Sequence, residues 1–290
     1  MHTVLSPHMK RLIIALGMVL LSASLGSCGS DKPKLPSPTS GPLKTTNNRD
    51  YRTPALNGPV PRNPDMTLRA DFSKDAGISF SRVPVLDKYI AITFDDGPHP
   101  QNTPRLLDML RMRNFKATFY MVGSSVDLYP QVVRRVVAEG HEVGNHSYSH
   151  RLLSKLSDSE VREELSRTRD AIGRAAGVQP RTLRPPYGGM LQRQREWVNA
   201  DFGYPIILWS VDPLDWKRPG PAAVCSRSLA GTTSGSIILA HDLHAQTVDA
   251  MPATLDGLLR RGFKFVTVSQ LLAMKSDMTT VHAAVQTPAP

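Results

Sequence analysis

Segments with the pattern of buried strands alternate with segments of helical spacing from residue 88 to residue 268. The strand-like segments are Lys88–Thr93, Ala117–Val122, Glu142–Gly144, Pro205–Val211, Ser236–Ala240 and Lys264–Val268. The helix-like segments are Asn102–Arg113, Gln131–Glu139, a long segment that ends near Gly177, and Val248–Arg261. A capping box, Ser157 to Glu160, opens the long helix. This alternation predicts an α/β domain with parallel strands, either an open doubly wound sheet or a barrel.

Polar motifs lie at the C-terminal ends of strands or just beyond them. They are Asp95-Asp96, His146, Arg184-Pro-Pro-Tyr187, Asp212-Pro-Leu-Asp215-Trp216 and Leu239-Ala-His241-Asp242. An open sheet usually concentrates its functional site at one switch point. The mouth of an α/β barrel instead gathers side chains from many strand ends. The distribution of the motifs therefore favours a barrel.

Asp95-Asp96 and the pair His146 and His150 together indicate a divalent-metal site. A spacing of four residues is one helical turn, so both imidazoles of a helix would lie on the same face. Either feature alone is weak, because such histidine pairs arise by chance and carboxylates also cap loops. Two adjacent acids after an apolar strand, however, repel each other unless a cation or a shared proton relieves them. Two imidazoles and one carboxylate would leave a position for water, as in catalytic zinc sites.

Five motifs, read in order, resemble those of the polysaccharide deacetylases, the family 4 carbohydrate esterases that share the NodB homology domain. The motifs are Thr93-Phe-Asp-Asp-Gly-Pro98, His146-Ser-x-x-His150, Arg184-Pro-Pro-Tyr187, Asp212-x-x-Asp215-Trp216 and Leu239-x-His241. The resemblance covers residues 87–272, and no motif position departs from the family pattern. It implies a distorted (β/α) barrel with fewer than eight units. It also implies removal of acetyl groups from N-acetylglucosamine polymers or, in some branches, of O-acetyl groups from xylan.

The resemblance divides the two acids between two roles. Asp96, His146 and His150 correspond to the metal ligands of the family. Asp95 corresponds to the general base that takes a proton from the attacking water, and Arg184 would pair with Asp95 and hold it ionised. The metal would polarise the acetyl carbonyl and make the water more acidic.

The other motif residues correspond to the leaving-group side of the reaction and to the substrate pocket. His241 resembles the general acid that protonates the departing amine, and Asp215 would orient it and keep it charged. The backbone N–H of Tyr187 would help to hold the oxyanion. Trp216 and Leu239 would form a small apolar pocket for the acetyl methyl group, although plain core packing is nearly as good an explanation for Leu239.

The motifs predict a polysaccharide N-deacetylase, a hydrolase of carbon–nitrogen bonds other than peptide bonds. The expected substrate is N-acetylglucosamine in peptidoglycan or an exopolysaccharide. The expected cofactor is zinc, with cobalt, nickel or manganese possible in the same ligand set. One alternative is an O-acetyl esterase acting on xylan with the same catalytic residues. An alternative of another class is a wall-binding lipoprotein that has lost turnover.

The N-terminal region has the pattern of a bacterial lipoprotein. Lys10 and Arg11 precede a short apolar run that ends in Leu25-Gly-Ser-Cys28, which resembles a lipobox with Cys28 as the lipidated residue. We therefore expect a signal peptide at 1–27 and a flexible tether at 28–66, which is rich in Pro, Ser, Thr and Gly. The deacetylase domain is expected at 67–275, followed by a disordered tail at 276–290.

These features predict a protein of the bacterial cell envelope, anchored to a membrane by lipid, with its catalytic domain outside the cytoplasm. Basic residues outnumber acidic ones by 35 to 25, which favours anionic surroundings such as lipid head groups or wall polymers. Nucleic acid is excluded as a partner by this location. We expect a monomer whose partners are an N-acetylated polysaccharide and the membrane.

Overall fold

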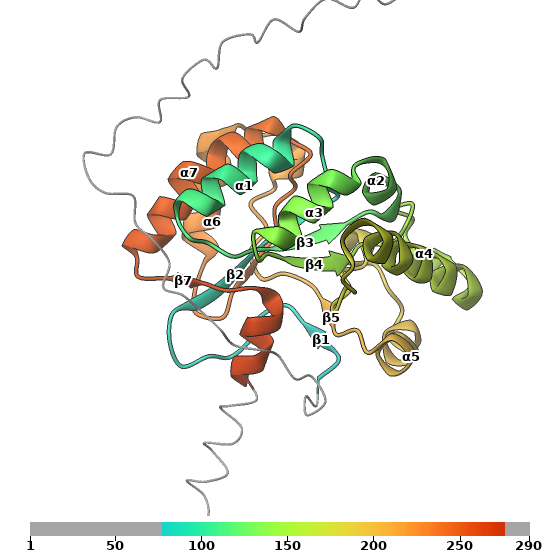
Figure 1. Ribbon diagram of the computed structural model, residues 1–290. Coiled ribbons are helices and arrows are strands. Elements are labelled where there is room, and N and C mark those ends of the chain that lie inside the picture. The colour runs from blue at the N-terminus through green and yellow to red at the C-terminus, as the bar shows by residue number, and fades with distance from the viewer. Residues whose placement is uncertain (1–76, 276–290) are drawn as a thin grey trace, which may run out of the picture. The chain divides into compact units, whose positions relative to one another are not determined.

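The computed structural model describes residues 77–275 (Figure 1). The strands are β1 (Ser79–Phe80), β2 (Tyr89–Asp95), β3 (Thr118–Met121), β4 (Glu142–Asn145), β5 (Ile206–Ile207), β6 (Ile237–Ile238) and β7 (Lys264–Phe265). The helices are α1 (Asn102–Met112), α2 (Gly123–Leu128), α3 (Pro130–Ala138), α4 (Asp158–Ala176), α5 (Gln192–Phe202), α6 (Pro221–Gly231) and α7 (Ala245–Arg260), with short 3-10 turns η1 (Leu153–Lys155), η2 (Pro186–Gly188) and η3 (Asp215–Lys217). The predicted signal peptide, Cys28, the tether, residues 67–76 of the predicted domain and the tail 276–290 lie outside the described residues.

The parallel strands close into an irregular circuit. The central strand β2 pairs with β3 on one side and, on the other, with β7 near its start and β6 further along. From β3 the ladder passes to β4 and, through a bridge at Leu183, to β5. The chain after β5 returns to the ladder at Val211, which pairs with Ile238 of β6. This circuit confirms the predicted fold class, a distorted (β/α) barrel with fewer than eight units.

Strands away from β2 are shorter than the hydrophobic pattern predicts. The segment predicted as one strand from Pro205 to Val211 pairs regularly only at β5, then bends and rejoins the ladder at Val211. Ser236–Ala240 and Lys264–Val268 shrink in the same way to β6 and β7, and residues 268–275 are helical. The hydrophobic pattern predicts that these segments are buried, and all of them are. It does not predict where the hydrogen bonding between neighbouring strands ends.

Helices α1, α6 and α7 lie together on one side of β2, as Figure 1 shows. Ile92 and Phe94 of β2 belong to the same buried cluster as Leu106 of α1 and Leu255 of α7. Ala91, which points to the opposite face of β2, belongs to a second cluster. Burial on both faces holds β2 rigidly, and its C-terminal end therefore offers a fixed platform for the residues that follow.

The longest helix, α4, begins and ends as the sequence predicts. Ser157 caps it in a reciprocal capping box with Glu160, and Gly177 ends it in the left-handed conformation at φ 68°. The sequence reasoning missed α2, α5 and α6. Helix α5 buries only Gln194 and Val198, and α6 only Val224 and Ser228, so neither carries a strong apolar stripe. No helix within residues 77–275 is long and apolar enough to span a membrane.

A buried ion pair joins the end of α1 to α7. The guanidinium of Arg113 donates to both carboxylate oxygens of Asp256, at 2.6 and 3.0 Å, and both side chains are almost fully buried. Asp256→Ala leaves the arginine charge buried and unpaired, so we expect it to lower the free energy of unfolding by about 3–5 kcal/mol. Arg193→Ala, which removes an exposed pair with Asp158, should cost less than about 1 kcal/mol. Urea denaturation of both variants checks this, and equal losses would contradict it.

Candidate metal centre and active site

The sequence motifs meet in one cavity of about 370 Å³ at the C-terminal ends of the barrel strands. Its lining includes the three predicted metal ligands, the predicted base and acid, and the side chains of Tyr187, Trp216 and Leu239. Trp209 and Asp212 also line it, although the sequence reasoning gave them no role. The structure therefore brings together every predicted site residue whose side chain was expected to face the substrate. Arg184 and Asp215 lie behind this lining.

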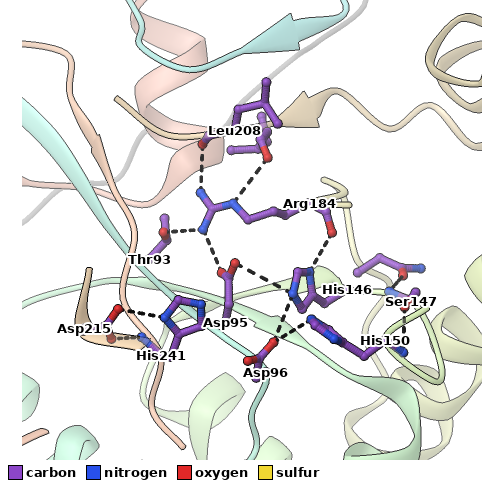
Figure 2. Close-up of polar contacts among 12 residues, drawn as sticks. Thr93, Asp95, Asp96, His146, Ser147, His150, Arg184, Leu208, Asp215 and His241 are labelled. Carbon is purple, nitrogen blue, oxygen red and sulfur yellow. Dashed lines mark hydrogen bonds and ion pairs between the residues drawn. The ribbon is translucent and has the colours of Figure 1, made fainter. Parts of the chain in front are cut away.

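Asp96, His146 and His150 converge on one point (Figure 2). The Oδ1 atom of Asp96 lies 3.2 Å from Nε2 of His146 and 3.0 Å from Nε2 of His150. One ligand atom from each of the three residues lies within 4.8 Å of the others. Burial would raise the pKa of Asp96, but its contacts with the two imidazoles outweigh this effect and hold the pKa well below its usual range.

The hydrogen bonds of His146 test whether a cation fits between these residues. Nδ1 of His146 lies 2.7 Å from the backbone carbonyl oxygen of Arg184, which can only accept, so Nδ1 carries the proton. In the neutral imidazole Nε2 then has a lone pair, and this lone pair faces a carboxylate oxygen of Asp96. Two acceptors at that distance repel each other unless a positive charge lies between them. Two imidazoles and a carboxylate are suitable ligands for a divalent metal, and this donor set fits one.

The segment from His146 to His150 is an irregular loop, so the prediction of a helical turn was wrong. Ser147 and His150 both have positive φ, 61° and 58°, which a regular α-helical turn does not allow. Asn145 Oδ1 accepts from the Ser147 N–H, and Ser147 Oγ accepts from the His150 N–H. These bonds fold the loop back, so the two imidazoles converge for a reason other than helical periodicity.

Asp95 is buried beside the triad but is not part of it. Arg184, which is fully buried, donates from Nη1 to Asp95 Oδ1 at 2.7 Å and to Thr93 Oγ1 at 2.5 Å. The same guanidinium donates to the carbonyl oxygen of Leu208 and lies over the ring of Tyr120. Arg184 is thus held on several sides, and it fixes one oxygen of Asp95. The other oxygen lies 3.8 Å from Nε2 of His146.

His241 lines the same cavity and lies beside Asp95, with which it forms a parallel bridge (Figure 2). Its ring Nδ1 lies 2.9 Å from Asp215 Oδ1, and its backbone N–H donates to Asp215 Oδ2. Thr247 donates to the same carboxylate. Burial alone would lower the pKa of His241, but the hydrogen bond and charge of Asp215 outweigh it and raise the pKa to about 9. His241 is therefore protonated at neutral pH, as a general acid must be.

This raised pKa predicts the alkaline limb of the pH–rate profile. Wild-type kcat/KM should fall as pH rises through about 9, where His241 loses its proton. Asp215→Asn removes the charge that holds this proton, so the limb should move toward the ordinary histidine value of 6.5. At pH 8 the variant should lose about tenfold or more in kcat/KM, and near pH 6 it should lose much less. A loss that is the same at every pH would contradict this role.

Tyr187, Trp216 and Leu239 surround the cavity in three different ways. Tyr187 is largely exposed, has φ 59°, and its ring lies 4.8 Å from that of His150. Trp216 is half exposed at the mouth, whereas Leu239 is buried beneath it. An exposed indole contributes little to the packing of the core, so Trp216 is available to contact a sugar or an acetyl group.

Asp242 is a buried carboxyl group that the motif analysis left without a role. It accepts a hydrogen bond from Thr103, and its Oδ1 atom has no hydrogen-bond partner among the described residues. Burial raises its pKa to about 7, and the nearby charges of Asp96 and Asp95 add to this. A Cβ atom at Gly97 would lie 2.5 Å from Oδ1. Asp242 thus requires a glycine directly after Asp95 and Asp96.

A parallel barrel that gathers two charge-paired groups and a possible metal triad at its mouth has an architecture that can support metal-assisted hydrolysis. The sequence model of the polysaccharide deacetylase family matches residues 82–207. A peptidoglycan-N-acetylglucosamine deacetylase from Bacillus cereus is 35% identical over 234 residues, which cover 75% of this chain and 83% of that protein. The chain belongs to the polysaccharide deacetylase family.

Other relatives extend the comparison. A peptidoglycan-N-acetylglucosamine deacetylase from Listeria monocytogenes is 43% identical over 189 residues, which are 65% of this chain and 40% of the relative. The solved peptidoglycan deacetylase of Bacillus subtilis is 37% identical with a TM-score of 0.65, covering 70% of this chain and 98% of that one. A family pseudoenzyme from Bacillus anthracis is 30% identical with a TM-score of 0.64, covering 67% and 68%. The fold alone therefore does not establish turnover, which depends on the residues of the site.

Proposed function

We propose that this protein is a metal-dependent hydrolase that removes N-acetyl groups from N-acetylglucosamine residues of a cell-envelope polysaccharide. The observation that carries the proposal is the placement of two charge-paired groups, Asp95 with Arg184 and His241 with Asp215, beside one possible metal triad. A base and an acid are both needed, because amide hydrolysis must activate water and protonate a poor leaving group. Relatives named as a peptidoglycan-N-acetylglucosamine deacetylase and a chitooligosaccharide deacetylase support the substrate class.

The base side of the reaction falls to Asp95. Arg184 holds one of its oxygens, which leaves the other oxygen, beside His146, free to accept the proton of the attacking water. A divalent metal bound by the triad would polarise the acetyl carbonyl and make the water more acidic. Arg184 gains no proton and changes no partner during this step, so it serves to position Asp95.

The acid side of the reaction falls to His241. Asp215 holds its Nδ1–H, and the proton on Nε2 is therefore the one that can pass to the departing nitrogen of the glucosamine. The backbone N–H of Tyr187 would stabilise the developing oxyanion, and Trp216 and Leu239 would enclose the acetyl methyl group. Acetate and a free amine are the products.

We propose zinc as the bound metal. Two imidazoles and one carboxylate suit it, and cobalt, nickel and manganese are the competitors for this ligand set. Metal analysis of the purified protein, followed by chelation and reconstitution with each ion, identifies the metal that restores turnover. Turnover that survives complete chelation would contradict a metal-dependent mechanism.

Two other functions compete with this proposal. An O-acetyl esterase would use the same residues, and an ester is the easier bond to cleave, so model acetate esters do not discriminate. A non-catalytic wall-binding protein is the other, and the pseudoenzyme relative gives it weight. The complete set of metal ligands, base and acid in this cavity favours catalysis.

Acetate release and free-amine formation test the proposal on a panel of polymers. The panel contains chitin oligomers, peptidoglycan, β-1,6-linked N-acetylglucosamine polymer and acetylated xylan. We expect equal amounts of acetate and free amine from an N-acetylglucosamine polymer. Acetate from xylan alone would establish the esterase, and polymer binding without acetate from any member would establish the non-catalytic function.

We also propose that Cys28 carries lipid and anchors the catalytic domain in the bacterial cell envelope as a monomer. The support is the lipobox-like sequence before Cys28 and the excess of basic residues. Cys28→Ala should shift the protein from the membrane fraction and abolish incorporation of a labelled fatty acid. Retention of the variant in the membrane fraction would contradict lipid anchoring.

A further inference from the structure

Two basic residues stand next to the indole at the mouth of the cavity. The 3-10 turn η3 and its flanks, Leu214–Arg218, form what we term the rim turn. Trp216 of this turn lines the cavity and is 49% exposed. Lys217 and Arg218 are exposed as well, and the ammonium group of Lys217 lies 4.9 Å from the centre of the Trp216 ring. Any sugar that stacks on Trp216 therefore comes close to a positive charge.

The rim turn is held firmly, so the position of these charges is defined. The backbone N–H groups of Lys217 and Arg218 donate to the carbonyl oxygens of Leu214 and Asp215. Leu214 and Arg218, at the two ends of the turn, have φ of 56° and 53°. Such left-handed backbone is strained for residues other than glycine and persists only where the surroundings enforce it. The carboxylate of Asp215, inside the turn, makes three hydrogen bonds that anchor it beside the catalytic histidine.

Neither cation of the rim turn has an acidic partner in the part of the chain that the structure describes. By contrast, the side chain of Arg184 is paired with a carboxylate. The exposed side chains of Arg162, Arg174 and Arg193 are also paired with carboxylates. Arg218 also acts on the nearby ring of His244. Burial lowers the pKa of His244, and among the neighbouring charges Arg218 lowers it further while Asp215 opposes this. The charge of Arg218 therefore reaches the ring of His244, which follows the cavity residue His241 by three positions.

The acids of the cavity do not neutralise this rim. Asp95 and Asp215 each have a cationic partner within hydrogen-bond distance. Among the described residues, the carboxylates of Asp96 and Asp212 have no such partner, and the two positive charges of a divalent metal in the triad would balance their two negative charges. The two charges of the rim turn are therefore in excess at the entrance, where an anionic group of a bound polymer would meet them.

We propose that Lys217 and Arg218 form a cationic subsite that binds a carboxylate on the sugar unit next to the reacting N-acetylglucosamine. The protein then prefers an anionic glycan to a neutral polymer of N-acetylglucosamine. This inference rests on the proposed N-deacetylase function and narrows its substrate. Peptidoglycan supplies such a carboxylate, because the muramic acid neighbour of each N-acetylglucosamine carries either a free lactyl carboxylate or, where that group is amide-linked to a peptide, the carboxylates of the peptide.

Two chemically modified chitins of matched length and acetylation test the subsite. Carboxymethyl chitin is anionic and glycol chitin is neutral, and the readout is the ratio of their kcat/KM values. We expect the wild-type ratio to exceed one at low salt and to shrink at about 0.5 M salt, where exposed charges are screened. In the double variant Lys217→Gln/Arg218→Gln the ratio should fall about fivefold, the effect of two exposed ion pairs.

Arg260→Gln is the matched control. Arg260 is an exposed arginine in the last turn of α7, at the end away from the cavity. Its removal changes the net charge without changing the rim, so the ratio should stay at the wild-type value. A double variant with an unchanged ratio, or a control with an equally reduced one, would overturn the proposal. Wall glycan strands with and without their peptides show whether the lactyl or the peptide carboxylate is bound.

A binding measurement separates this inference from the proposed function. The Asp95→Asn protein retains the rim turn, and its retardation by each polymer is measured by affinity electrophoresis. If the wild-type protein releases no acetate from either polymer, the N-deacetylase function fails. Stronger retardation by carboxymethyl chitin, lost in the Lys217→Gln/Arg218→Gln background, would still support the subsite, and equal retardation by both polymers would refute it.

Discussion

Asp95→Asn should lower kcat by about 10³-fold, in the range that removal of a general base produces. The amide has nearly the shape of the carboxylate, so the packing around it changes little, but it cannot accept the proton of the attacking water. The bound metal should remain at one ion per chain, because the carboxylate of Asp96 and not that of Asp95 belongs to the triad. Acetate release and elemental analysis on the same preparation measure both quantities.

The opposite result would reverse the roles of the two acids. If Asp95→Asn released the metal and Asp96→Asn retained it, the ligand would be Asp95. Thr93→Val serves as the control for disturbance of Arg184, because Thr93 Oγ1 accepts from the same Nη1 atom as Asp95. A small loss of activity in Thr93→Val would show that the large loss in Asp95→Asn comes from the missing base.

His146→Ala should abolish both metal binding and turnover. It removes one of three protein ligands, and with it the Nδ1–H bond to the Arg184 carbonyl that orients the remaining lone pair. After dialysis the variant should hold less than about a tenth of an equivalent of metal, and its kcat/KM should fall by about 10³-fold or more. Elemental analysis and acetate release give the two values.

A histidine outside the triad provides the comparison. His99 accepts backbone N–H groups through Nδ1 at the start of α1, and His99→Asn should keep both metal and activity. Excess zinc should not rescue His146→Ala, because its ligand set is incomplete. Full activity of His146→Ala without bound metal would contradict the assignment of the centre.

The sequence predicted much of the fold and of the site because both depend on local signals. The buried strand β2 is a continuous apolar run, and two adjacent carboxylates at its end repel each other unless a cation or a shared proton relieves them. The capping box of α4 is equally local, since Ser157 and Glu160 are three residues apart. Motifs placed after successive strands indicated a barrel mouth, and the closed circuit of parallel strands confirms it.

The parts that escaped prediction depend on contacts between distant segments. The loop from His146 to His150 takes its shape from positive φ at two residues and from the side chains of Asn145 and Ser147, and the four-residue spacing suggested a helix instead. Helices α5 and α6 each bury few side chains, so their sequences lack a clear periodicity of apolar residues. The sequence does not reveal that the carboxyl group of Asp242 packs against Gly97, because the two residues lie far apart in the chain.

The proposed base and the proposed acid are neighbours on one backbone ladder. Asp95 forms a parallel bridge with His241, and its N–H donates to the carbonyl oxygen of Ala240. The separation of their backbones is therefore set by the spacing of two adjacent strands, about 4.8 Å. A substrate that binds slightly too deep cannot be accommodated by spreading these two residues apart. Adjustment to a bound polymer would then fall to the turns that carry Tyr187 and Trp216, which lie outside this ladder.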